Sequence, residues 1–276
     1  MKTNYQNKKG TALITGASSG IGEIYADRLA KRGYDLILVA RDQKKLESLA
    51  KRLTEETGVQ AEVFQADLTS KADLARVEKR LRTDDQITLL VNNAGMSVEG
   101  SLVGGDLDRI ETMIQLNVTA PTRLAGAVAP GFVSRGSGTI INISSVLALA
   151  PELFGGVYSG TKAYLLNLSL SLHQEIGKKG VRIQVVLPGA TRTAIWEKSG
   201  KDVSKLPAGI SLMEVDEMVD AALAGLDLGE VVTIPSLPDA RDWEALNIAR
   251  VALRPKLSRD HAADRYKATM SPCFKG

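Results

Sequence analysis

Short apolar runs alternate with longer amphipathic stretches over most of the chain. Thr11–Thr15 and Asp35–Ala40 predict strands, and the continuous apolar run of the second is typical of a strand buried on both faces. Between them, Ile21–Arg32 predicts a helix that stops at Gly33. The same rhythm predicts strands at Ala61–Gln65, Ile87–Val91, Thr139–Ile143, Arg182–Leu187 and Val231–Ile234, and helices at Gln43–Glu56, Ser70–Arg82, Asp106–Ser134, Gly155–Lys179 and Glu214–Leu226.

Strands that alternate with helices of this length predict βαβ units and a parallel sheet. We therefore expect one doubly wound α/β domain with about seven strands over residues 11–234. Residues 1–10 form an N-terminal extension, and residues 235–276 form a C-terminal extension with a helix near Arg241–Leu253. Residues 191–213 lack clear periodicity and read as a loop, a common place for a substrate lid.

Cysteine and histidine are scarce in the 276 residues. The single cysteine, Cys273, excludes an intramolecular disulfide and a cysteine-based zinc site. The two histidines, His173 and His261, lie 88 positions apart, so no metal site is predicted. The longest stretch without a charge, Gly136–Pro151, is too short and too polar to span a membrane. With a polar N-terminus and no signal-peptide pattern, the expected setting is soluble, reducing and cytoplasmic.

The formal net charge of +3 does not indicate a nucleic-acid partner. Residues 1–234 hold 27 basic and 27 acidic side chains, whereas residues 235–276 hold 8 basic and 5 acidic ones. A neutral body with a mildly basic tail is a poor match to the basic stripe of a nucleic-acid-binding protein. We expect neither a nucleic-acid nor a membrane partner.

A glycine-rich loop joins the first predicted strand to the first predicted helix. It reads Thr15-Gly16-Ala17-Ser18-Ser19-Gly20-Ile21-Gly22. Glycine permits a tight turn and lets backbone N–H groups approach a pyrophosphate at a helix N-terminus. Ser18 and Ser19 are candidates to cap the helix or to donate to phosphate. The position between a strand and a helix favours dinucleotide binding over a plain structural turn.

The end of the second strand predicts which dinucleotide binds. An acid there would bind the ribose 2′-hydroxyl of NAD, and an arginine would hold the 2′-phosphate of NADP. Here Ala40 closes the strand and Arg41 follows, which favours NADP. Asp42 is the competing signal for NAD, and it is equally suited to be the N-cap of the next helix.

Two further segments fit a bound dinucleotide. Asp67 and Leu68 close the third strand, where a carboxylate can accept from an adenine amino group or merely cap a turn. Asn93, Ala94 and Gly95 follow the fourth strand, where small residues let the chain pass close to a ribose. Asn93, or Asn92 before it, can equally hydrogen-bond neighbouring loops.

Tyr158 and Lys162 stand four positions apart in a predicted helix and therefore share one face. A free phenol has a pKa of about 10, and a nearby ammonium lowers it, so the pair can act as a general acid and base. A second copy of the spacing, Tyr5 and Lys9, precedes the first strand and is set aside. Ser145 lies 13 residues before Tyr158, just after a strand. It is the candidate for a serine that acts beside Tyr158, and Ser144 is the alternative candidate.

These segments together resemble the short-chain dehydrogenase/reductase family in its compact form, which has a Rossmann-type fold. The matching positions, in the order of the family, are TGASSGIG, Asp67, NNAG, Asn117, Ser145, Tyr158-x-x-x-Lys162 and Pro188-Gly189.

The resemblance implies roles for these residues. Tyr158 exchanges a proton with the substrate oxygen, while Lys162 lowers its pKa and binds the nicotinamide ribose. Ser145 hydrogen-bonds the carbonyl or alkoxide, and Asn117 holds a helix distortion and a water that feeds a relay to Lys162. The segment after the sixth strand, Pro188, Gly189, Thr191 and Thr193, faces the nicotinamide, with Thr193 on its amide group.

The sequence thus predicts an oxidoreductase that transfers hydride between NADP(H) and a small-molecule carbonyl or alcohol. The alternatives are an NAD-dependent alcohol dehydrogenase and a non-catalytic dinucleotide-binding regulatory protein. Phe154 and Trp196 are expected to flank the pocket as an apolar substrate wall. The resemblance also implies a homodimer or homotetramer formed through the helices that contain Asn117 and Tyr158.

Overall fold

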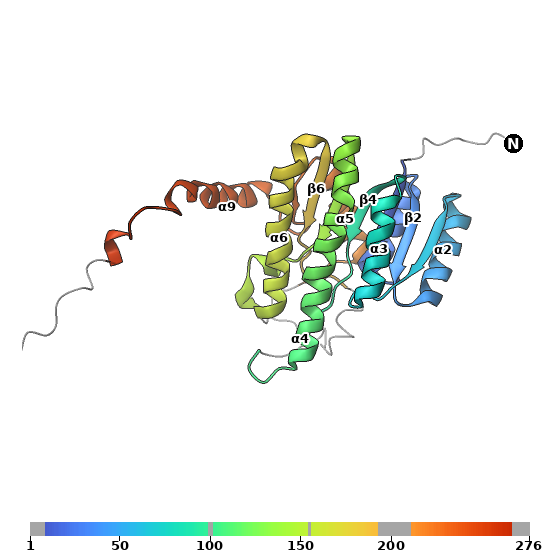
Figure 1. The fold of residues 1–276 in the computed structure, drawn as a ribbon, viewed down its shortest axis with the longest axis horizontal. Helices are drawn as coiled ribbons and strands as arrows, with labels where there is room; N and C mark the ends of the chain where they lie inside the picture. Colours follow the sequence, from blue (N-terminus) through green and yellow to red (C-terminus); the bar gives the residue numbers. More distant parts are fainter. Residues whose placement is uncertain (1–8, 99–101, 154–155, 193–210, 267–276) are drawn as a thin grey trace, which may run out of the picture. The chain divides into compact units, whose positions relative to one another are not determined.

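The computed structural model describes residues 9–98, 102–153, 156–192 and 211–266. Its centre is a seven-stranded parallel sheet in the order β3-β2-β1-β4-β5-β6-β7 (Figure 1). The strands are β1 (Thr11–Thr15), β2 (Asp35–Ala40), β3 (Ala61–Gln65), β4 (Ile87–Asn92), β5 (Gly138–Ile143), β6 (Val181–Val186) and β7 (Val232–Thr233). The predicted doubly wound Rossmann-type sheet is confirmed.

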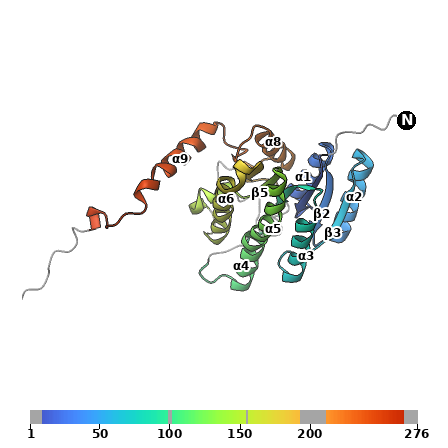
Figure 2. The same ribbon diagram turned by 45° about the horizontal axis from the view of Figure 1, so that its top comes forward.

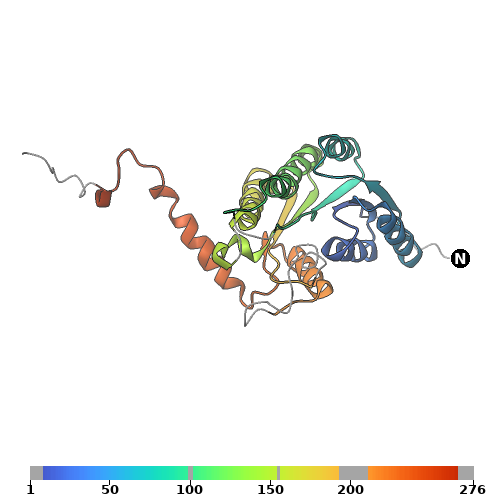
Figure 3. The ribbon, with the colours of Figure 1, turned by 90° about the horizontal axis from the view of Figure 1, so that it is seen from below.

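Helices cover both faces of the sheet, as the view along its edge shows (Figure 3). One apolar core lies between the sheet and α1 (Gly20–Lys31), α2 (Gln43–Thr57) and α8 (Val215–Asp227). The other core lies between the sheet and α3 (Lys71–Thr83), α5 (Ala120–Arg135) and α6 (Gly156–Ile176). Strands buried on both faces explain the continuous apolar runs in the sequence.

Helices α1 and α8 lie side by side although they are far apart in the sequence (Figure 2). Arg28 of α1 joins them, since its guanidinium pairs with Asp216 at 2.8 Å and with Asp220 at 2.7 Å. These contacts fold the end of the domain back onto its beginning.

The strand order reverses between β1 and β4, because β2 and β3 extend the sheet to one side and β5 to β7 extend it to the other. In open α/β sheets, ligands bind at such a switch point, outside the carboxyl ends of the strands. The loops that follow Thr15, Ala40, Asn92 and Ile143 meet at this edge. The fold therefore gathers the predicted site residues from segments that are distant in the sequence.

The chain divides into two compact units, Met1–Pro235 and Ser236–Gly276. In the second unit, α9 (Ala240–Ala252) begins at Asp239, whose carboxylate accepts from the Arg241 backbone N–H at 2.9 Å. No residue of α9 is buried. Within the described ranges, no helix is long and apolar enough to cross a membrane.

Candidate active site

The glycine loop begins directly after β1, and two of its glycines adopt backbone conformations that other residues avoid. Gly16 has φ +68° and Gly20 has φ +59°, both left-handed. Gly22 is required by packing instead, because a Cβ there would lie 2.4 Å from the Gly16 carbonyl oxygen. The loop brings the chain into α1, whose first N–H groups have no acceptors within the helix. This is a fitting cradle for a phosphate group.

Some side chains around the glycine loop stabilise its conformation, and others are placed to contact a bound phosphate. The Asn93 amide nitrogen donates to the carbonyl oxygens of Thr15 at 2.9 Å and Gly16 at 3.3 Å, so Asn93 braces the loop, as one of its two readings predicted. Ser19 occupies the N-cap position of α1, but its hydroxyl makes no capping hydrogen bond, so the capping alternative is wrong for Ser19. Ser18, Ser19 and Ile21 stand at the helix entrance where a pyrophosphate would bind.

The two candidate selectors of the dinucleotide have different surroundings. Asp42 is the N-cap of α2, since its carboxylate accepts from the Lys45 backbone N–H at 3.1 Å. Arg41 is exposed, and its guanidinium forms no ion pair with any residue that the structure describes. The cap interpretation of Asp42 therefore holds, and Arg41 remains available to an anionic group.

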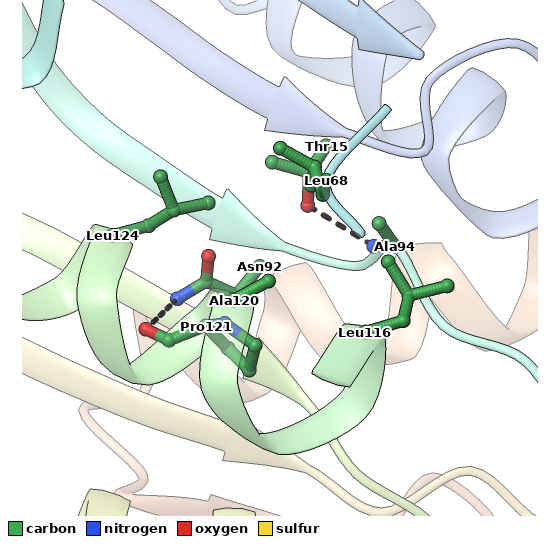
Figure 4. Close-up of a pocket in the computed structure, with 8 residues that line it drawn as sticks. All are labelled: Thr15, Leu68, Asn92, Ala94, Leu116, Ala120, Pro121 and Leu124. Atoms are coloured by element: carbon green, nitrogen blue, oxygen red, sulfur yellow. Dashed lines mark hydrogen bonds between the residues drawn. The ribbon is translucent and has the colours of Figure 1, made fainter. Parts of the chain in front are cut away.

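Asp67 and Leu68 lie at the end of β3. Asp67 Oδ1 accepts from the Thr69 N–H at 2.9 Å and the Thr69 hydroxyl at 2.7 Å, which leaves Oδ2 for a ligand. Leu68 and Ala94 line a shallow hollow that is partly open to solvent (Figure 4). Ala94 is fixed there by its N–H, which donates to the Thr15 hydroxyl at 3.0 Å.

A π-helical turn, η1 (Gln115–Thr119), joins α4 (Leu107–Ile114) to α5, and Asn117 stands at its centre. Such turns are rare in proteins, and those that occur are often found at functional sites. Pro121 follows one turn later and has no N–H to offer the Asn117 carbonyl. The helix distortion that the resemblance implied at Asn117 is thus a feature of the fold.

The Asn117 side chain connects three segments. Its oxygen accepts from the Met96 N–H at 2.9 Å, and its nitrogen donates to the Met96 carbonyl at 2.8 Å and the Thr161 hydroxyl at 3.1 Å. The amide therefore holds the loop after β4 against the turn of α6 that carries Lys162. Thr161 has no motif of its own, and only the fold reveals it.

Tyr158 and Lys162 are one turn apart on α6, with the Lys162 Nζ 5.6 Å from the centre of the Tyr158 ring. Lys162 is buried, and its ammonium donates to the Ile143 carbonyl at 2.9 Å. Ser145 lies near enough to the Tyr158 hydroxyl to lower its pKa, whereas the Ser144 hydroxyl donates to the Lys162 backbone carbonyl at 2.7 Å. Ser145 is therefore the serine that faces the phenol, as the spacing favoured.

Burial shifts the proton affinities of both groups. It raises the pKa of Tyr158 to about 12, against the opposing effect of the Ser145 hydrogen bond. It lowers the pKa of Lys162 from 10.5 to about 8. The sequence predicted that the ammonium would depress the phenol pKa. Here burial outweighs any such effect, so the resting phenol is a proton donor.

The segment after β6 reaches the same edge of the sheet. The Pro188 carbonyl accepts from the Val146 N–H at 3.0 Å, and the Gly189 carbonyl accepts from the Thr191 hydroxyl at 3.1 Å. Pro188, Gly189 and Thr191 thus lie beside Ser145. Thr193, Phe154 and Trp196 lie outside the described residues. Among the described residues, no group of three or more His, Cys, Asp or Glu side chains is arranged to hold a metal ion.

The sequence model of the short chain dehydrogenase family matches residues 10–204. The chain belongs to this family. It is an oxidoreductase by that membership, and the resemblance that the motifs indicated is confirmed.

Two solved structures and one curated relative show how close the likeness is. A short-chain dehydrogenase from Sphingobium yanoikuyae in complex with NADPH is 54% identical, with a TM-score of 0.90 over 93% of this chain and 100% of that one. A bulky-bulky ketone specific alcohol dehydrogenase from Comamonas testosteroni is 50% identical, with a TM-score of 0.85 over 93% and 98%. An uncharacterized oxidoreductase from Staphylococcus saprophyticus is 34% identical over 67% of this chain and 79% of its own.

Proposed function

We propose that this short-chain dehydrogenase transfers hydride between NADP(H) and a bulky, apolar ketone or the corresponding secondary alcohol. The observation that carries the proposal is the pair of Tyr158 and the buried Lys162, one helical turn apart on α6, with Ser145 just after the end of β5 beside them. The alternatives are an NAD-dependent alcohol dehydrogenase and a regulatory protein that binds a dinucleotide without turnover.

The side chains at this edge suit proton transfer to a carbonyl oxygen. Ser145 and Tyr158 both present hydroxyls, so a carbonyl between them would receive two hydrogen bonds. With its pKa raised to about 12, Tyr158 keeps its proton until the oxygen gains negative charge. Lys162, with its pKa lowered to about 8, is positioned to return a proton toward Tyr158. When bound, the nicotinamide supplies or accepts the hydride.

The residues at the other end of the site fit NADP(H). The cradle of Gly16, Gly20 and Gly22 suits a pyrophosphate, and Arg41 suits a 2′-phosphate because no described carboxylate pairs with it. The Sphingobium relative, 54% identical, was solved with NADPH, which supports the same cofactor for this chain.

The substrate side is apolar. Ser145 is followed by Val146-Leu147-Ala148-Leu149-Ala150-Pro151, and within this stretch Leu149 is 38% exposed. Leu153 close by is 61% exposed. This uncharged segment directly after Ser145 favours ketones with apolar groups, and the name of the Comamonas relative, a bulky-bulky ketone specific alcohol dehydrogenase, supports bulky ones.

The test is a panel of matched carbonyl compounds in which NADPH and NADH consumption are followed side by side. Bulky apolar ketones should be reduced with NADPH at least about tenfold faster than ketones that carry a carboxylate. Equal rates on both classes would contradict the proposed preference for apolar ketones. A preference for NADH over NADPH would establish the NAD alternative. NADPH binding without consumption on any compound would establish the regulatory alternative.

We further propose that the enzyme is a homodimer or homotetramer formed through α5 and α6. The exposed apolar side chain of Ile114, at 40%, next to this helix pair supports an interface there. Size-exclusion chromatography with light scattering tests it, because a mass near 29.5 kDa would show a monomer. The cytoplasmic setting stays a prediction from the sequence.

A further inference from the structure

The apolar core between the sheet and helices α5 and α6 contains three polar side chains. Asn92 of β4 and Asn142 of β5 are paired in register, so both point to the same face of the sheet. Asn92 is 4% exposed, and Asn142 and Ser169 of α6 are fully buried. Their strand neighbours Leu90 and Ile140 on this face are apolar, and apolar residues would fill these positions at lower cost.

These side chains form one continuous chain of hydrogen bonds. The Asn92 amide nitrogen donates to the Pro121 carbonyl of α5 at 3.3 Å (Figure 4) and to the Asn142 side-chain oxygen at 2.9 Å. The Asn142 nitrogen donates to the Ser169 hydroxyl at 2.8 Å, and that hydroxyl donates to the Leu165 carbonyl of α6 at 2.7 Å.

The ends of this chain lie one turn from the catalytic groups. Pro121 follows Asn117 by four residues, directly after the π-helical turn, and Leu165 follows Lys162 by three. The hydrogen bonds therefore span from the helix of Asn117, through the two central strands, to the helix of Tyr158 and Lys162.

The orientation of the Asn92 amide carries a cost. Its nitrogen lies between two oxygens, so turning the amide over would place oxygen against oxygen. In the observed orientation, Asn92 Oδ1 is buried and has no hydrogen-bond partner in the described part of the chain. A buried acceptor without a partner is costly, so the two hydrogen bonds that the Asn92 nitrogen donates are kept against that cost.

We propose that Asn92, Asn142 and Ser169 are positioning residues for the reaction, and that they set the spacing between the Asn117 turn and the Tyr158–Lys162 helix. The proposal rests on the proposed function. Buried, nearly saturated amide networks are rigid, and a catalytic group displaced by about 1 Å can lose on the order of a hundredfold in rate. The network therefore fixes the distance between the Asn117 turn and the helix of Tyr158 and Lys162, which apolar contacts alone would leave adjustable.

The chain offers a matched control on the other face of the sheet. Gln184 of the adjacent strand β6 is also a fully buried amide, and it also has an oxygen without a partner among the described residues. Its nitrogen donates to the Ala222 carbonyl of α8 at 2.8 Å, so it connects the sheet to a helix that holds no catalytic residue. Asn142→Leu and Gln184→Leu thus remove comparable amides with different neighbours.

The experiment compares these two variants and the milder Ser169→Ala in the full-length enzyme. The midpoint temperature of thermal unfolding should fall by similar amounts in both leucine variants. Only Asn142→Leu, and Ser169→Ala to a smaller degree, should lower kcat, by about tenfold or more for the first, with KM for NADPH within about twofold. Both should also move the pH at which the rate of alcohol oxidation is half-maximal, because the surroundings of Tyr158 and Lys162 change.

An equal fall in stability with unchanged kcat and pH profile in Asn142→Leu and Ser169→Ala would show that the network only packs the core. So would an equal change of the pH profile in Gln184→Leu. If Asn142→Leu does not fold, Ser169→Ala decides alone, since alanine is well tolerated inside a helix. Failure of the proposed function is separate, because the wild-type enzyme would then reduce no carbonyl compound.

Discussion

On the β1–β3 side of the sheet, the residues assigned to the dinucleotide lie on loops and at a helix start, whereas on the β4–β6 side the catalytic side chains lie within or beside the core. Arg41 is exposed, while Asn117 is 1%, Lys162 is 5% and Ser145 is 8% exposed. The first side works through glycine conformations and helix N–H groups, which need few contacts with the rest of the chain. The second side works through buried polar groups whose pKa values depend on their surroundings.

This difference predicts that substitutions on the catalytic side change turnover and pH dependence, and that those on the dinucleotide side change binding. Tyr158→Phe should have the largest effect, a loss of about a thousandfold or more in kcat, because the proton donor is removed. NADPH affinity should stay within about threefold, since the ring is kept. Stopped-flow or steady-state reduction of a bulky ketone measures the first quantity, and fluorescence titration measures the second.

Tyr164→Phe is the matched control on the same helix. Its hydroxyl hydrogen-bonds the Thr122 hydroxyl at 2.9 Å on a partly exposed face, so kcat should not change. Substantial turnover left in Tyr158→Phe would mean that another group donates the proton.

Lys162→Met tests the cost of burying an ammonium. The folded state has a Lys162 pKa of about 8 against 10.5 when unfolded, so between these values the unfolded chain binds more protons and the stability of the enzyme rises with pH. Below pH 8, the buried charge opposes folding by about 3 kcal/mol. Chemical denaturation from pH 7 to 10 should show this rise in the wild type and not in Lys162→Met.

The exposed Lys178 supplies the comparison, because Lys178→Met should keep the wild-type pH dependence of stability. A Lys162→Met enzyme whose stability rises with pH as in the wild type would show that Lys162 does not titrate in this range.

Gly22→Ala tests the packing of the glycine loop. The added Cβ would meet the Gly16 carbonyl oxygen at 2.4 Å and the Asn93 amide nitrogen at 2.5 Å, so the loop must move. Such overpacking costs about 1–3 kcal/mol, and NADPH affinity should fall by about thirtyfold. Gly126→Ala, at an open position of α5, should leave affinity unchanged. Unchanged affinity in Gly22→Ala would place the dinucleotide elsewhere.

Arg41→Ala should have the smallest effect and the most specific one. Loss of a charged hydrogen bond to a 2′-phosphate should weaken NADPH by about tenfold and leave NADH within about twofold. The exposed neighbour Lys44 is the control, since Lys44→Ala should change neither. Equal weakening of both dinucleotides in Arg41→Ala would mean that Arg41 does not contact the 2′-phosphate.

The same difference between the two sides explains what the sequence could predict. The Gly16–Gly22 loop and the Tyr158–Lys162 pair are local patterns, and the strands and helices follow from hydrophobic periodicity. These features could therefore be predicted from the sequence. The contacts of Asn117 with Thr161, and of Asn92 with Asn142, join residues 44 and 50 positions apart. No local pattern encodes them. The Tyr158 pKa was predicted in the wrong direction for the same reason, because burial is set by the whole fold.

Transfer of the label from NADPH deuterated at the hydride position tests the central claim most directly. With a bulky apolar ketone, mass spectrometry should find one deuterium on the carbinol carbon of the alcohol that the wild-type enzyme forms, and no labelled alcohol with Tyr158→Phe. NADPH consumed without deuterium in the product, or labelled alcohol formed at the wild-type rate by Tyr158→Phe, would contradict the account.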